Sequence, residues 1–114
     1  MGNLAVLLKA QGKLGEAEPL YREALAARRD TLGPRHPSTL GSMNNLARLL
    51  QNQGNLGEAK QLLHEALAGW WEVLGPTHPD TRDAYAVLLN LLTKQGATRE
   101  ARELSAMYGA AARN

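Results

Sequence analysis

Apolar residues recur along this chain at intervals of three and four positions, the spacing that places side chains on one face of an α-helix. Met43, Leu46, Leu49 and Leu50 form one such stripe. After a short polar break, a second stripe consists of Ala59, Leu62, Leu63, Ala66, Leu67, Trp70 and Leu74. The pattern predicts two amphipathic helices that are joined by a turn.

The pattern repeats with a period of 42 residues. The Gln-Gly pair at residues 11–12 returns at 53–54 and again at 95–96. Other matching pairs of segments are 3–5 and 45–47 (Asn-Leu-Ala), 14–17 and 56–59 (Leu-Gly-Glu-Ala), 23–26 and 65–68 (Glu-Ala-Leu-Ala), and 32–34 and 74–76 (Leu-Gly-Pro). So many matches, in one order and at one offset, indicate an array of similar helical hairpins.

Glycines and prolines mark where the predicted helices end and begin. Gly54 and Gly75 suit helix C-termini, because glycine takes the left-handed conformation of a C-terminal cap without strain. Pro79 suits the first turn of a helix, where its missing N–H has no partner to lose, and we expect Pro19 near the start of its helix for the same reason. The expected helices are 2–11, 16–32, 37–53, 58–74, 79–95 and 98–112.

The order of small residues resembles the tetratricopeptide repeat. Ala47, Gly54, Ala59 and Ala66 stand in the order of that motif, and residues 5, 12, 17 and 24 repeat it. The period of 42 residues and the linker Leu-Gly-Pro-x-His-Pro-x-Thr resemble the kinesin-light-chain type of repeat. The resemblance implies an all-α fold: a right-handed α-α superhelix (a tetratricopeptide solenoid) of about 2.5–3 helix–turn–helix repeats.

We expect a single domain, residues 1–114, with a truncated first repeat (1–35), a second repeat (36–77) and a third repeat with a C-terminal cap (78–114). The first repeat lacks about two helical turns relative to the second. Its apolar residues Leu4, Leu7 and Leu8 are therefore expected to lie uncovered and to favour homodimers or exchanged elements, unless the first helix frays.

The resemblance also implies that the first helix of each repeat lines a concave groove. The groove positions that we assign from it are Asn44, Asn45, Arg48, Gln51, Asn52, Asn90 and Lys94. Helical periodicity independently leaves four of them, Asn44, Arg48, Gln51 and Asn52, off the apolar stripe. Amide groups can bond a peptide backbone, and Arg48 and Lys94 can bond acidic groups; the alternative is an ordinary solvated face.

The carboxylate clamp by which some tetratricopeptide domains grip a chain terminus is not expected here. Of the positions that this clamp requires, only Asn45 carries a suitable residue, and Asp83 stands where a lysine is needed. Recognition of a C-terminal peptide of the chaperone kind is therefore disfavoured.

Two adjacent tryptophans, Trp70 and Trp71, cannot both point along one helical stripe. We expect one to pack beside Gly69 and the other to be partly exposed. An exposed tryptophan could anchor a partner on the outer face, because tryptophan is enriched among interface hot spots. The alternative is packing against a neighbouring helix.

Composition excludes several classes of function. Lys and Arg number 13 against 11 Asp and Glu, so no basic stripe for nucleic acid is expected. The chain has no cysteine, which excludes disulfides and thiolate metal sites. No apolar run approaches the roughly 20 residues of a membrane span. We expect a cytoplasmic protein without a membrane or nucleic-acid partner.

Candidate chemistry is sparse. His36 and His78 occupy the same place in two linkers, and His64 has no other ligand at a spacing typical of zinc sites. Glutamates recur near three predicted helix starts, where the helix dipole favours a carboxylate: Glu16, Glu58 and Glu100. We therefore expect no enzymatic activity, no metal and no cofactor.

Together these features predict a non-catalytic protein–protein interaction scaffold that binds a peptide or a helical segment in its concave groove. The alternative is a self-associating assembly element, a dimer or domain swap through exposed solenoid ends, within a larger repeat protein.

Overall fold

The computed structural model describes residues 14–109, and every element in that range is helical. The helix expected at 2–11, with Leu4, Leu7 and Leu8, lies outside the described residues. The elements in chain order are α2 (Leu14–Leu32), α3 (Pro37–Asn52), α4 (Leu56–Leu74), α5 (Pro79–Lys94), α6 (Thr98–Leu104) and a π-helical turn, η1 (Ser105–Gly109).

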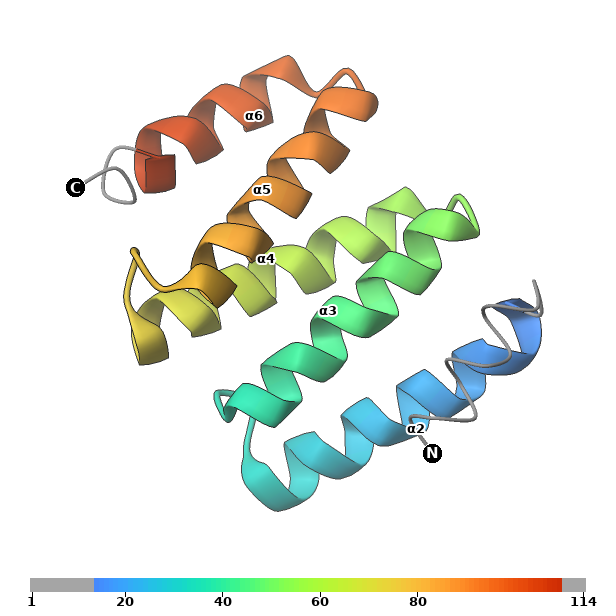
Figure 1. Cartoon of the computed structure of the whole chain (residues 1–114). Coiled ribbons are helices and arrows are strands. Elements are labelled where there is room, and N and C mark those ends of the chain that lie inside the picture. Colours follow the sequence, from blue (N-terminus) through green and yellow to red (C-terminus); the bar gives the residue numbers. More distant parts are fainter. Residues whose placement is uncertain (1–13, 110–114) are drawn as a thin grey trace.

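Each helix packs against the next one along the chain. Successive helices form hairpins, and α2 and α6 lie at opposite ends of the stack (Figure 1). Helix α4 contacts both α3 and α5, so it joins one hairpin to the next. This arrangement is an all-α helical-repeat superhelix, as the sequence predicted.

The core consists of leucines separated by small residues. Leu46, Leu63 and Leu88 are fully buried, and so are Ala47 and Ala66. Alanine at such positions lets two helices approach closely, because it extends no further than Cβ. The apolar stripes of the sequence thus become one continuous core shared between neighbouring hairpins.

Gly69 lets the start of α3 and the linker before it lie directly against α4. A Cβ atom at this position would collide with the buried side chain of Leu40, and it would lie 3.2 Å from the guanidinium group of Arg35. Leu40 at the start of α3 and Arg35 in the linker before it lie beside Gly69. The expectation that a tryptophan packs there stays a prediction, and the next residue, Trp70, is buried in the core.

The repeated histidines begin two helices. The Nδ1 atoms of His36 and His78 accept hydrogen bonds from the backbone N–H groups of Ser38 and Asp80, each at 3.1 Å. In both cases a proline follows the histidine and occupies the first turn. A histidine stands at the same place in both linkers because it caps the N-terminus of the helix that follows, α3 or α5.

The observed helix bounds differ by more than one residue from the approximate expected ones at three places. Helices α2 and α4 begin two residues earlier than expected, at Leu14 and Leu56. Pro19 therefore lies within the second turn of α2, where its ring nitrogen cannot donate to a carbonyl one turn earlier. At the other end, α6 stops at Leu104, and the wider turn η1 replaces the expected continuous helix. That turn coincides with an edge-to-face contact between Tyr108 and Trp71.

Ion pairs connect the second helices of successive hairpins. Arg22 on α2 donates to both carboxylate oxygens of Glu58 on α4, at 2.6 and 2.8 Å. Lys60 on α4 bonds both oxygens of Glu100 on α6, at 3.2 and 3.1 Å. These glutamates, which the sequence assigned to the helix dipole, thus also join neighbouring helices.

Enlarging Ala66 is expected to destabilise the stack. Ala66 is fully buried on the helix that joins the two hairpins, so Ala66→Leu should lower the free energy of unfolding by about 1–3 kcal/mol through overpacking. Urea denaturation measures this change. Ala86→Leu, at an exposed position of α5, is the matched control and should stay within roughly 0.5 kcal/mol of the original. Equal stability of both variants would contradict the packing described here.

The carboxyl group of Glu58 is expected to titrate below its ordinary range. The two hydrogen bonds from Arg22 are the main cause of its lowered pKa. Because the folded-state pKa is depressed, this contribution to stability is present at neutral pH and is lost as the pH falls through that pKa. Titration followed by NMR should show the low value, and Arg22→Met should raise it towards the usual 4.3 or so.

Arg29→Met provides the matched control for this titration. Arg29 also lies on α2 but pairs with Glu65, at 2.9 Å. Its removal should leave the pKa of Glu58 nearly unchanged. If both variants moved that pKa equally, a general field and not the direct contact with Arg22 would be its cause.

Candidate functional site

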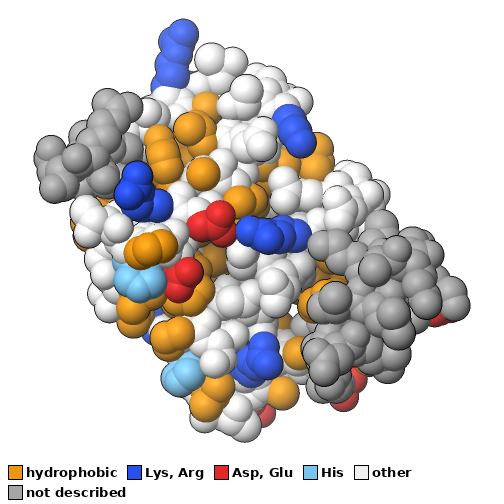
Figure 2. Space-filling model, in the orientation of Figure 1, with side chains coloured by type: hydrophobic (Ala, Val, Ile, Leu, Met, Phe, Trp, Pro, Cys, Tyr) orange, Lys and Arg blue, Asp and Glu red, His pale blue; other side chains and the backbone are white. Residues whose placement is uncertain are grey.

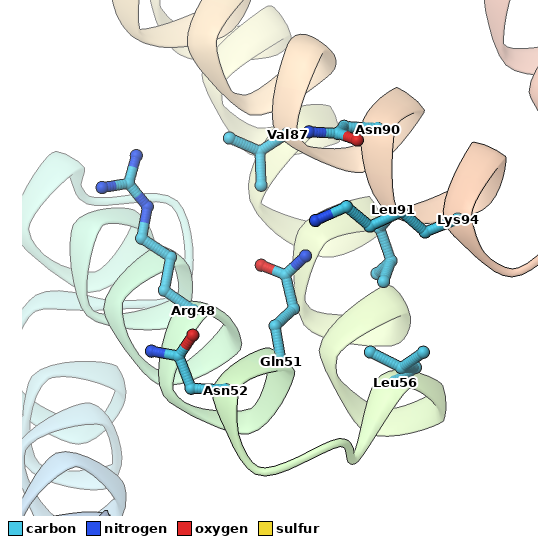
Figure 3. Close-up of a pocket in the computed structure, with 8 residues that line it drawn as sticks. All are labelled: Arg48, Gln51, Asn52, Leu56, Val87, Asn90, Leu91 and Lys94. Atoms are coloured by element: carbon cyan, nitrogen blue, oxygen red, sulfur yellow. The ribbon is translucent and has the colours of Figure 1, made fainter. Parts of the chain in front are cut away.

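A cavity of about 330 Å³ opens between α3, the start of α4, and α5. The residues that line it are Arg48, Gln51, Asn52, Leu56, Val87, Asn90, Leu91 and Lys94. Figure 3 shows Gln51 and Lys94 extending towards each other between α3 and α5, with Leu56 at the start of α4 below them. The first helices of two successive hairpins therefore supply most of the wall.

The wall of the cavity combines two kinds of side chain. Gln51, Asn52 and Asn90 carry amide groups, and Arg48 and Lys94 carry positive charges. An amide can donate to a peptide carbonyl and accept from a peptide N–H, and a cation can bond a carboxylate. These side chains reach the cavity because they lie on the polar sides of α3 and α5, away from the buried leucines.

Part of the cavity lining is apolar. Leu56 and Val87 are half-buried there, and Leu91 is fully buried. Apolar surface within a largely polar hollow favours a ligand that inserts a hydrophobic side chain. The cavity thus offers an apolar contact together with hydrogen bonds and positive charge.

Five of the seven groove residues expected from the sequence line this cavity: Arg48, Gln51, Asn52, Asn90 and Lys94. The other two do not. Asn44 is half-buried and Asn45 is exposed, and both lie nearer the start of α3 than Arg48 does. Among residues 14–109, the buried Oδ1 atom of Asn44 has no hydrogen-bond partner.

Sequence reasoning missed two parts of the site. Leu56 appeared only within a repeated segment and Leu91 was not considered as a site residue, yet both border the cavity. It also missed that Asp83 on α5 accepts a hydrogen bond from Arg48 on α3, at 3.1 Å. The only signal in the sequence was that both residues lie on polar helix positions, since the separations of such pairs vary, at 35 here and at 36 and 40 for Arg22–Glu58 and Lys60–Glu100.

The two tryptophans have different environments. Trp70 belongs to the core and is only 7% exposed. Trp71 is half-buried, and its ring lies edge-to-face with that of Tyr108, with 4.8 Å between the ring centroids. A shallow hollow beside them is lined by Ala68, Trp71, Met107 and Tyr108. Trp71 is thus the member of the pair that reaches the surface.

Charges of both signs and apolar side chains are interspersed on the face of the molecule seen in Figure 2.

Among residues 14–109, no group of three or more His, Cys, Asp or Glu side chains could hold a metal ion. Within the same range, no helix is long and apolar enough to cross a membrane.

Comparison with known proteins identifies the repeat. The tetratricopeptide repeat family matches residues 1–68 and again residues 41–108. A comparison with curated protein sequences gave no match.

Solved structures resemble the chain over most of its length. A putative kinesin light chain from Podosopora anserina, described as having nearly identical TPR-like repeats, is 32% identical with a TM-score of 0.80, over 90% of this chain and 48% of that one. BtubC (BKLC) from P. vanneervenii shares the fold at 21% identity with a TM-score of 0.80, over 89% of this chain and 40% of that one. This chain thus spans less than half of either structure. It belongs to the tetratricopeptide repeat family, with repeats of the kinesin-light-chain type.

Proposed function

We propose that this chain is a non-catalytic scaffold that binds a peptide or helical segment of another protein in the cavity between α3 and α5. Tetratricopeptide repeats generally mediate protein–protein interactions, and the chain belongs to that family. The observation that carries the proposal is the cavity itself, which combines two cations, three amides and three apolar side chains. A cytoplasmic location is part of the same proposal.

The chemistry of the cavity defines the ligand that fits it best. An extended segment would insert one apolar side chain above Leu56, Val87 and Leu91 and would hydrogen-bond its backbone to the amides of the wall. An acidic residue beside the apolar one would reach Arg48 or Lys94. We therefore expect a preference for peptides in which a hydrophobic residue is flanked by carboxylates.

Binding of a peptide library tests this proposal. Labelled peptides with a central leucine or tryptophan flanked by glutamates would be titrated with the protein and followed by fluorescence anisotropy. Arg48→Glu and Lys94→Glu should each raise the Kd by about tenfold or more, because they place a negative charge opposite the ligand's carboxylate. Asn52→Ala should raise it by roughly two- to tenfold through loss of a hydrogen bond.

Arg99→Glu is the matched charge reversal outside the cavity. Arg99 lies on α6 and its side chain is 93% exposed, so the reversal should leave the Kd within about twofold. Absence of binding to every peptide, or binding that none of the cavity variants weakens, would contradict the proposal.

Self-association is the second candidate function, and its basis is the apolar sequence around Leu4, Leu7 and Leu8. Light scattering after size-exclusion chromatography distinguishes the two. If the chain stays a monomer at high concentration and still binds peptide, the result supports the scaffold function and contradicts self-association.

A further inference from the structure

The ion pair between Arg48 and Asp83 joins the two helices that border the cavity. Arg48 lines the cavity from α3, whereas Asp83 lies on α5 outside the lining. A single contact connects them, from one guanidinium nitrogen to one carboxylate oxygen at 3.1 Å. Asp83 thus pairs with a cation of the cavity lining, although it is not itself one of the lining residues.

This contact is weaker than the bidentate ion pair between Arg22 and Glu58 on the outer helices. Arg22 gives two hydrogen bonds to Glu58, at 2.6 and 2.8 Å, and a third to Glu18. Arg48 gives one longer bond to Asp83, and the two side chains are 46% and 54% exposed. Exposed single contacts of this kind contribute little to stability, whereas a bidentate carboxylate binds arginine more strongly. An incoming carboxylate can thus replace Asp83.

Lys94 is the other cation of the cavity, and within the described part of the chain it forms no ion pair. With Asp83 in place, the charges of Arg48 and Asp83 cancel, and Lys94 alone supplies net positive charge at the cavity. Without Asp83, two cations would face the ligand. Asp83 therefore bears directly on how strongly the cavity attracts acidic groups.

We propose that Asp83 sets the charge selectivity of the cavity by competing with an acidic ligand for the guanidinium group of Arg48. The inference rests on the proposed function and adds to it a specificity-determining residue outside the lining. Asp83 lowers the affinity for acidic segments, and a ligand reaches full affinity only when its own carboxylate displaces that of Asp83.

The variant Asp83→Asn tests this inference. Two fluorescein-labelled peptides serve as probes: one carries leucine between glutamates, and the other carries leucine between glutamines. Asp83→Asn should tighten binding of the glutamate peptide by about three- to tenfold and leave the glutamine peptide within about twofold. Asp80→Asn removes the same charge from the same helix but lies three positions earlier, beside His78, and should change neither Kd by more than about twofold.

A double variant shows whether the gain passes through Arg48. In Arg48→Gln the further change Asp83→Asn should no longer tighten binding, because the competing partner is gone. Thermal denaturation should give nearly the same Tm for Asp83→Asn and the original chain, which separates competition from a change in the fold.

The outcomes separate this inference from the proposed function. Tighter binding that depends on Arg48, or binding that appears only in Asp83→Asn, supports competition. Two results would contradict the inference while the original chain still binds the glutamate peptide: Asp83→Asn has no more effect than Asp80→Asn, or it tightens binding equally in the Arg48→Gln background. In either case the inference is wrong, and the proposed scaffold function is unaffected. If neither the original chain nor Asp83→Asn binds either peptide, both are wrong.

Discussion

The burial of leucine faces between neighbouring hairpins is the constraint on which this structure depends. A single hairpin exposes one apolar side, and only the next hairpin can cover it. Helix α4 performs this role at the centre, where it packs on α3 and on α5. Fully buried alanines such as Ala47 and Ala66 let the helices come close enough for their leucines to share one core. The cavity exists because this packing fixes α3 beside α5.

Charged side chains divide into two groups in this stack. On the second helices they serve the architecture, since Arg22 and Glu58 bridge α2 and α4 and Lys60 and Glu100 bridge α4 and α6. On the first helices they border a cavity that is partly lined by apolar side chains. A well-paired charge between helices is satisfied by the protein itself, whereas a loosely held charge beside a hollow is available to a ligand. This difference underlies the proposed role of Arg48 and Lys94.

Local sequence signals were sufficient for the fold. The period of 42 residues, the stripes of leucine and the Gly-Pro and His-Pro pairs gave the type of repeat and the order of the helices. Helix ends were less well predicted. Leu56, the first residue of α4, packs partly against the core, and α6 gives way to a π-helical turn where Tyr108 contacts Trp71. Both features depend on neighbours that periodicity alone does not reveal.

For the candidate site, the sequence determined which residues are polar on the first helices, because helical periodicity separates Arg48 and Gln51 from the buried leucines. Only the tertiary structure decided which of them meet. Partners in neighbouring hairpins stand 36, 35 and 40 positions apart, as for Arg22 with Glu58, Arg48 with Asp83 and Lys60 with Glu100, and not at the repeat period of 42. The structure brings Arg48 to Asp83, and it leaves Asn44 and Asn45 outside the cavity. These meetings depend on how side chains pack between helices, which a single helix does not encode.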